Sequence, residues 1–480
     1  MGPIARGAAT ATILLLLLAA LTSSAAAQCS NTAPPSNTTV TCSGSSSTPV
    51  VAVAGSSGVT INVVPGASVS ASHSLAVPFP ILSVDQNSAI TNNGTLSLSG
   101  GAGSGTNRGA AMLGNTNGNT LTNAAGATIT TTGAFNDGMA ANGSGNTLTN
   151  NGTITTAGPN AYGMSAAWGQ TNTGQLNNTL TNTGTVSTSG SNARAASILG
   201  GSGTINNSGT LSTTGAASNA AYLQGNNDQL INSGKIVVTG ASSDAVFSNT
   251  VSSSFTATIK NLAGGQIISQ NGSAIRTLNG NTTIINAGLV QSNVGTAISM
   301  GNGNNALVLQ TGSNIVGIAN GGGGSNTVTL QGTGTASNPF VNFQTLMMQG
   351  TAWNWTGSGT FTTALLQSGT LTLTGTLGAS PAVSVSSGAA PDMAGVSQTF
   401  GNVNNAGTIF THGAGPGTTL TVANYAGAGG NIVFNTFLGA DNSPSDRLVI
   451  NGGKATGTTT LTINNTTAPE NRRLRTASWW

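Results

Sequence analysis

The chain has 480 residues, of which only 4% are charged and 4% aromatic, while 70 are glycine and the formal net charge is +3. Disordered chains combine low hydrophobicity with high net charge, whereas this chain is 37% hydrophobic and nearly neutral. The composition therefore permits a folded protein held together by backbone hydrogen bonds. It contains no basic stripe typical of nucleic-acid binding and no acidic run typical of metal binding.

The N-terminus has the pattern of a secretory signal peptide. Arg6 precedes an apolar run, Ile13–Leu21, and the small residues Ala25–Ala27 follow it. This order of a positive flank, a short apolar core and a small-residue cleavage site predicts removal of residues 1–27, with cleavage before Gln28. The apolar run is well short of the ~20 residues that span a bilayer. We therefore expect an exported chain, not an anchored one.

The chain has two cysteines, Cys29 and Cys42, close together after the expected cleavage site. In an exported protein such a pair predicts a local disulfide. A metal or redox pair is the alternative, but His73 and His412 are too far away in the sequence to suggest a ligand set. We assign residues 28–86 to a β-rich N-terminal cap that contains this disulfide.

One phrase recurs along the chain: apolar, any, Asn, any, Gly, any, apolar. Copies stand at Ile90–Leu96, Leu148–Ile154 and Leu180–Val186, and the period is about 25 residues with loop insertions. A second, weaker phrase, such as Gly163-Met164, falls midway in each period. Asn and Gly at the bends tolerate positive φ, and asparagines can stack in ladders. Three or four apolar residues per period cannot bury themselves alone, so stacked copies, a β-solenoid, are expected. Helix is disfavoured by the many glycines.

The repeats divide the chain into segments. We expect a repeat β-helix over residues 87–300, and a continued solenoid with coils of different length over residues 301–423. A stem follows over residues 424–465, and residues 466–480 form a tail of different composition. The stem has the densest apolar alternation, including Phe434 and Leu448. We therefore expect it to hold the largest buried side chains and to unfold last.

Three stretches resemble a known family. Ser368–Gly375 is similar to a passenger-associated transport repeat, and Asn435–Gly439 with Ser443–Ile450 is similar to the stem of pertactin-like autotransporter passengers. The resemblance implies an all-β, right-handed parallel β-helix of the pectin-lyase-like kind. It also implies delivery through the periplasm to the cell surface, the outer membrane or the medium. The family's outer-membrane barrel needs at least ~8 strands, but only seventeen residues follow Ile463. We expect a truncated or frameshifted reading frame.

No catalytic, cofactor or metal site is predicted. Gly321–Thr329 fits a calcium-binding nonapeptide except that Asn326 replaces the aspartate, which predicts a simple turn. The adjacent pair Asp446 and Arg447 is expected to lock a turn. Ranks of outward Thr and Ser, from Thr95 onward, predict a solvated hydroxyl face, with ice binding as the alternative and a register break at Lys235.

Two classes of function remain open. The first is a structural and adhesive passenger that contacts a host or neighbouring cell surface, a glycan or matrix, through loops such as Ala167–Gln170 and Tyr222–Gln224. The second is an enzyme built on a β-helix, of the polysaccharide lyase type, against which the scarcity of charge argues. A fragment without function is the third reading. None of these readings involves nucleic acid.

Overall fold

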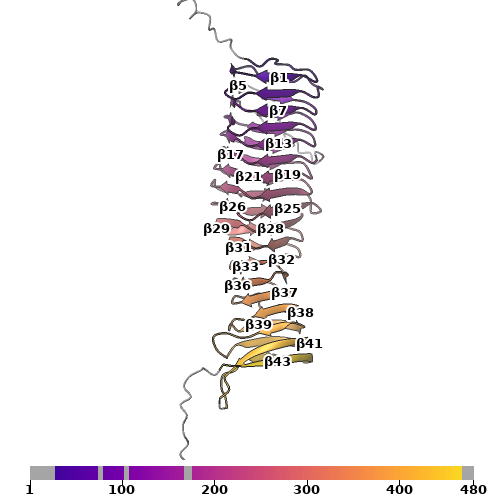
Figure 1. Cartoon of the computed structure of the whole chain (residues 1–480), viewed down its shortest axis with the longest axis vertical. Coiled ribbons are helices and arrows are strands. Elements are labelled where there is room, and N and C mark those ends of the chain that lie inside the picture. The colour runs from indigo at the N-terminus through magenta and orange to yellow at the C-terminus, as the bar shows by residue number, and fades with distance from the viewer. Residues whose placement is uncertain are drawn as a thin grey trace, which may run out of the picture.

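The structure, a computed structural model, describes residues 28–73, 79–101, 108–166, 174, 176–439 and 441–466. The expected signal peptide and most of the tail lie outside these residues. The described residues contain strands and no helix, and they form a long rod in which the strands follow one another along the axis in chain order (Figure 1). The all-β prediction is confirmed.

Each coil of the N-terminal half contributes three strands, and each strand pairs in parallel with the strand three places earlier and three places later. The result is a parallel β-helix, as expected, and its strands form three faces. Face one consists of β1 (Thr39–Cys42), β4 (Thr60–Val63), β7 (Ala89–Asn92), β10 (Thr120–Asn123), β13 (Thr147–Asn150), β16 (Thr179–Asn182), β19 (Thr204–Asn207), β22 (Asp228–Asn232), β25 (Thr256–Asn261) and β28 (Asn281–Asn286).

Face two consists of β2 (Ser45–Ser46), β5 (Ser68–His73), β8 (Thr95–Gly100), β11 (Thr128–Thr131), β14 (Thr153–Thr156), β17 (Thr185–Thr188), β20 (Thr210–Thr213), β23 (Lys235–Val238) and β26 (Gln266–Ser269). Face three consists of β3 (Val50–Val51), β6 (Phe79–Val84), β9 (Gly109–Gly114), β12 (Asn136–Ala141), β15 (Tyr162–Ala166), β18 (Arg194–Ile198), β21 (Asn219–Leu223), β24 (Val246–Ser248) and β27 (Ile275–Thr277). On face two the outward threonines stack in register. The rank of hydroxyl side chains ends, as expected, where Lys235 pairs with Thr210 and Val237 pairs with Ser212, although the strand pairing itself continues.

The coils become shorter toward the C-terminus. Hydrogen-bonded side chains of adjacent coils are 25 residues apart at Asn182 and Asn207 but only 18 apart at Gln349 and Gln367. The strands of this part are β29 (Leu289–Ser299), β30 (Ala306–Leu309), β31 (Asn314–Asn320), β32 (Thr327–Leu330), β33 (Thr333–Ala336), β34 (Phe340–Val341), β35 (Thr345–Met348), β36 (Ala352–Trp355), β37 (Thr363–Leu373), β38 (Ala382–Asp392), β39 (Gln398–Asn405), β40 (Thr408–Phe410), β41 (Thr419–Thr436), β42 (Arg447–Ile450) and β43 (Ala455–Asn465).

The repeat asparagines form a buried ladder inside the rod, as predicted. The Nδ2 atom of Asn182 donates a 2.8 Å hydrogen bond to Oδ1 of Asn207 in the next coil, and further donations from Asn182 reach backbone carbonyls. The same 2.8 Å bond joins each successive pair of the series Asn92, Asn123, Asn150, Asn182, Asn207, Asn232, Asn261 and Asn286. Buried amides are costly unless they are hydrogen-bonded, so the ladder fixes the coil-to-coil register at this bend.

The repeat glycines have a different role from the one expected. A Cβ added to Gly184 would lie 2.0 Å from the carbonyl oxygen of Gly152, and one added to Gly209 would lie 2.1 Å from that of Gly184. None of these three glycines has a positive φ, whereas Asn160 and Asn192 at other bends do. Glycine is therefore required here because successive backbones approach too closely for any side chain.

The largest fully buried side chains do not lie in the stem, so that expectation is wrong. They are Trp353, Trp355, Phe340 and Phe343, which fill the short coils before it. Phe340 and Trp355 have ring centroids 4.9 Å apart. In the stem, Phe434 is buried but Leu448 is only partly covered. The reason is that no further coil of the described residues lies beyond β43 to cover the stem's side chains, and Leu461 and Ile463 of β43 are 58% and 52% exposed.

Candidate functional site

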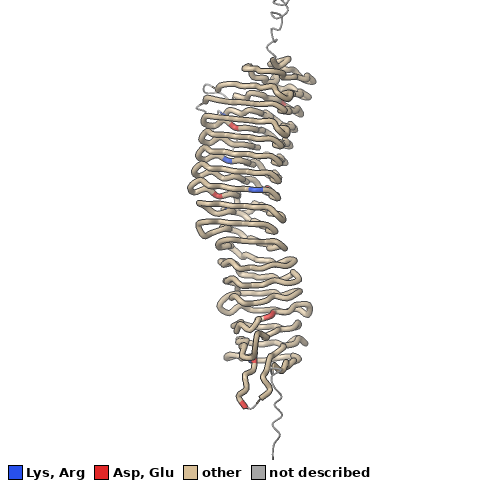
Figure 2. Tube along the Cα trace, turned by 60° about the vertical axis from the view of Figure 1, so that its left-hand side comes forward, with Lys and Arg blue, Asp and Glu red and all other residues tan. Residues whose placement is uncertain are grey.

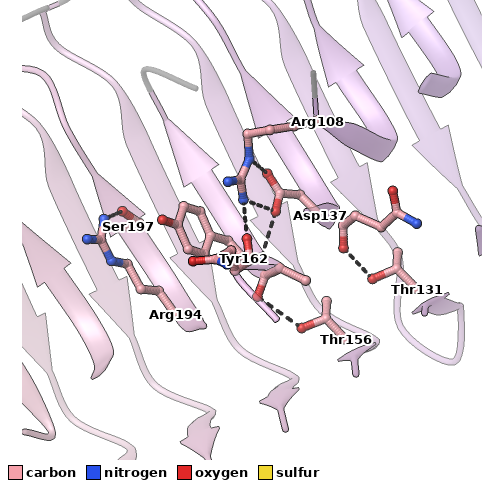
Figure 3. A network of polar contacts seen from close by, with 10 residues as sticks. Arg108, Thr131, Asp137, Thr156, Tyr162, Arg194 and Ser197 are labelled. Atoms are coloured by element: carbon pink, nitrogen blue, oxygen red, sulfur yellow. Dashed lines mark hydrogen bonds and ion pairs between the residues drawn. The ribbon is translucent and has the colours of Figure 1, made fainter. Parts of the chain in front are cut away.

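Charged residues are rare along the rod (Figure 2). Several of their side chains lie over aromatic rings on face three. The first is Arg108, which is buried beside Asp137: its Nε and Nη2 atoms lie 3.0 and 2.5 Å from the two carboxylate oxygens. Nη2 also donates to the carbonyl oxygen of Asn160 at 2.6 Å. The guanidinium lies over the ring of Tyr162, 4.2 Å from its centroid. Figure 3 shows this cluster spanning three coils.

Burial and pairing act in opposite directions on Arg108. Burial is the largest single influence and lowers the pKa of Arg108, but the Asp137 carboxylate and, to a smaller extent, Tyr162 together raise it more, so the net shift of the pKa is upward. The guanidinium therefore stays charged and paired. Such a buried pair is strongly destabilised when one partner is removed, because the other charge is left uncompensated. Arg108 and Asp137 accordingly act as a cross-link between coils and not as a ligand site.

Arg194 continues the series on the next strand and lies between two tyrosines. Its guanidinium carbon is 5.1 Å from the ring centroid of Tyr162 and 3.3 Å from that of Tyr222. Its Nη1 donates to Ser197 Oγ at 3.2 Å. Arg194 is half-buried, and no carboxylate of the described residues lies within 4.0 Å of it. It is thus a cation held by rings without a counter-charge.

Phe247 and Arg276 extend the series by two more coils. The rings of Tyr222 and Phe247 meet edge to face at 5.6 Å, and the guanidinium carbon of Arg276 is 5.3 Å from the Phe247 ring centroid. Arg276 lies 3.6 Å from Asp244, and 48% of its side-chain surface is exposed. We call Tyr162, Arg194, Tyr222, Phe247 and Arg276 the arginine–aromatic band.

Sequence reasoning did not find this band. Tyr222 was expected in a contact loop, but it is a strand residue of β21 and is buried beneath Arg194. The other expected loop, Ala167–Gln170, lies outside the described residues. The second phrase of each period could have revealed part of the band. Tyr162 and Arg194 each stand directly before a copy of this phrase, and they are register partners in the sheet.

The remaining candidates of the sequence have structural surroundings. Both carboxylate oxygens of Asp446 are used: Oδ1 accepts from the backbone N–H groups of Gly417 and Thr418, and Oδ2 accepts from Asn435 N and Thr411 Oγ1, all within 2.9 Å. Asp446 therefore locks the loop that leads into the last coils. Asn326 of the glycine-rich stretch is buried and accepts a hydrogen bond from the N–H of Asn305, as a rung in a second ladder of side chains.

Two further features complete the survey. His412 Nε2 lies 3.7 Å from the Asp392 carboxylate, and His73 stacks on Phe79 with 5.4 Å between ring centroids. A groove of about 510 Å³ is lined by residues of the stem and of the coils before it, among them Asn402, Asn424, Tyr425 and Lys454. Within the described ranges no three His, Cys, Asp or Glu side chains are grouped so that they could hold a metal ion. A search of the same ranges found no helix long and apolar enough to cross a membrane.

The N-terminal end of the rod contains the disulfide that the sequence predicts as a local cross-link. Cys29 and Cys42 are bonded, and both are buried at the edge of the hydrophobic core. Cys42 ends β1, so the bond ties residues that precede the first strand onto the first coil. The disulfide is therefore a structural feature of the cap.

Comparison with known proteins places the C-terminal part of the rod. Residues 398–473 match the model of the family described as Autochaperone Domain Type 1. A segment of 74 residues is 38% identical to the uncharacterized protein YuaQ of Escherichia coli (strain K12), and this alignment covers 15% of the present chain but only 5% of that protein. The matched family segment begins at β39 and includes the whole of the stem. Together with the parallel β-helix that this segment closes, the match supports an autotransporter passenger domain.

Proposed function

We propose that this passenger is a structural and adhesive protein, exported to the cell surface or the surrounding medium, where it contacts a host cell, a neighbouring cell or a matrix. The identity of the chain as an autotransporter passenger supports export. The rod itself supports a display role, because a continuous solenoid holds side chains of successive coils at a fixed strand spacing of ~4.8 Å.

The observation that carries the adhesive proposal is the gathering of rare residue types on one face. The chain has only eleven Lys and Arg and three Tyr in total, yet Arg194 and Arg276, neither of them fully buried, stand with Tyr162, Tyr222 and Phe247 on face three. Arginine and aromatic residues are the types that dominate binding energy at protein interfaces. An ordinary solvated face needs no such concentration.

The test is an adhesion assay with the purified passenger. Beads coated with the passenger should attach to epithelial cells or to bacteria of the same strain, and beads coated with an unrelated β-rich protein should not. Incubation with polyuronate and calcium would release unsaturated sugar products from a polysaccharide lyase. Absence of attachment together with such release would contradict the proposal and favour the enzyme.

A further inference from the structure

Arg194 is the member of the arginine–aromatic band with the most unused binding capacity. A guanidinium has five N–H donors in a planar fork, and Ser197 Oγ accepts from Nη1. The flanking rings of Tyr162 and Tyr222 hold the plane in place without supplying negative charge. Holding the fork in advance reduces the entropy lost when an anionic group binds to it.

The rest of the band extends from Arg194 along the rod axis. Ser197, Tyr222, Phe247 and Arg276 are successive register partners on β18, β21, β24 and β27. At ~4.8 Å per strand, Arg276 lies about 14 Å along the axis from Arg194. Asp244 partly offsets Arg276 at 3.6 Å, so Arg194 is the stronger anion contact and Arg276 the weaker one.

We propose that this band binds an acidic polysaccharide that lies along the rod axis, a proposal that rests on the adhesive function above. A carboxylate or sulfate group of the sugar accepts hydrogen bonds from the Arg194 fork. The apolar face of a neighbouring sugar packs against the half-exposed ring of Phe247. A second anionic group reaches Arg276. Nucleic acid fits less well, because its binding needs many cations along the backbone, and the band with Asp244 carries a net charge of only one.

The test measures binding of the purified passenger to three immobilised polymers: polygalacturonate, dextran sulfate and neutral dextran. The two acidic polymers separate a carboxylate from a sulfate ligand, and neutral dextran measures attachment without charge. We expect binding to at least one acidic polymer, weakened by salt, and none to neutral dextran. Arg194→Gln should weaken that binding about tenfold or more, and Arg276→Gln should weaken it less.

Lys235→Gln on face two and Lys260→Gln on face one are the matched controls, because each removes the same charge from another side of the rod. They should leave binding within about twofold. Equal losses in the controls and in Arg194→Gln, or binding to neutral dextran as strong as to the acidic polymers, would overturn the proposal. Circular dichroism and the midpoint of thermal unfolding identify a variant that fails to fold, and Arg276→Gln, whose side chain is more exposed, then supplies the second reading.

The bead assay separates this proposal from the function on which it rests. Passenger-coated beads that adhere to cells equally well with Arg194→Gln and with the unchanged protein would leave adhesion standing and remove the band as its site. If the unsubstituted passenger binds acidic polymer but its beads do not adhere to cells, the adhesive function is wrong and the polysaccharide site still stands.

Discussion

The carboxylate Oδ1 of Asp228 accepts a 2.9 Å hydrogen bond from the backbone N–H of Gly203 in the preceding coil. In the coils before it, the same acceptor position belongs to the neutral amides of Asn119, Asn146 and Asn178. Asp228 is fully buried, and no ion pair of the described residues involves it. A carboxylate thus occupies a position where the fold elsewhere uses an uncharged side chain.

Asp228→Asn should stabilise the passenger at neutral and alkaline pH. Burial raises the pKa of Asp228 to about 7 from a usual value of 3.8, against hydrogen bonds from Gly203 and Gly225 that lower it. The folded state therefore binds the Asp228 proton more tightly than the unfolded state does. The stabilisation that comes from this proton is fully present below pH 3.8 and is lost as the pH rises through about 7. Thermal unfolding of both proteins between pH 4 and pH 8 measures this. The advantage of the asparagine variant should be greatest near pH 8, and an advantage that grows toward pH 4 would contradict the prediction.

Asn207→Ala should destabilise the passenger by about 2–4 kcal/mol. It removes two rungs of the ladder at once, the bond accepted from Asn182 and the bond donated to Asn232, and leaves buried groups unsatisfied. Asn206→Ala is the matched control, because Asn206 is the adjacent residue of β19 and points outward. Denaturant unfolding compares the two. Equal losses for both variants would show that the ladder adds nothing beyond a surface asparagine.

Gly209→Ala should destabilise the passenger by about 1–3 kcal/mol or more. The added Cβ would lie 2.1 Å from the carbonyl oxygen of Gly184, and backbone cannot move aside without separating two coils. Gly415→Ala, where nothing lies within 4 Å of the added atom, should be nearly neutral. The midpoints of thermal unfolding of the two variants measure the difference. An unchanged midpoint for Gly209→Ala would mean that the coils can move apart without loss of stability.

The residue pattern predicts the ladder but not the arginine–aromatic band, and the difference is physical. Asn182 and Asn207 occupy the same place in every copy of a phrase, because a buried amide stack tolerates no other residue without loss of hydrogen bonds. Tyr162 and Arg194 occupy equivalent places with different side chains, and an insertion of variable length separates the coils. Only the strand register brings them together. Exposure in the stem likewise depends on what covers β43, which no local pattern encodes.

Cys29 and Cys42 should be found as a disulfide in the exported passenger. Closing so short a loop adds about 2–3 kcal/mol, and the bond holds the residues before β1 onto the first coil. Peptide mapping by mass spectrometry with and without reductant measures the pairing. Cys29→Ala with Cys42→Ala should fray the first coil and leave the Arg194 band intact. Alkylation of both thiols in the exported, unreduced protein would contradict the prediction.

Limited proteolysis should leave a protected fragment that includes residues 327–377. Each coil of a solenoid is stabilised mostly by its own core and the interfaces with its neighbours. In the short coils, here called the aromatic coils, the ring of Trp355 contacts the rings of Phe340 and Phe361. Leu461 and Ile463 at the end of the stem are exposed. The protease should therefore cut the stem before it cuts the aromatic coils. Trp355→Ala should cost about 3–5 kcal/mol, and Leu448→Ala, at a partly covered position, should cost less.

The two variants also distinguish this order of unfolding from a rod in which all coils are equally stable. With Leu448→Ala, the protected fragment should keep the aromatic coils and lose only residues after about Thr419, the start of β41. With Trp355→Ala, the protease should cut within the aromatic coils and so separate the longer N-terminal coils from the stem. A fragment confined to residues 424–465 that outlasts the aromatic coils would show instead that strand length and hydrogen bonding in β41 and β43 outweigh buried aromatic area in setting the last part to unfold.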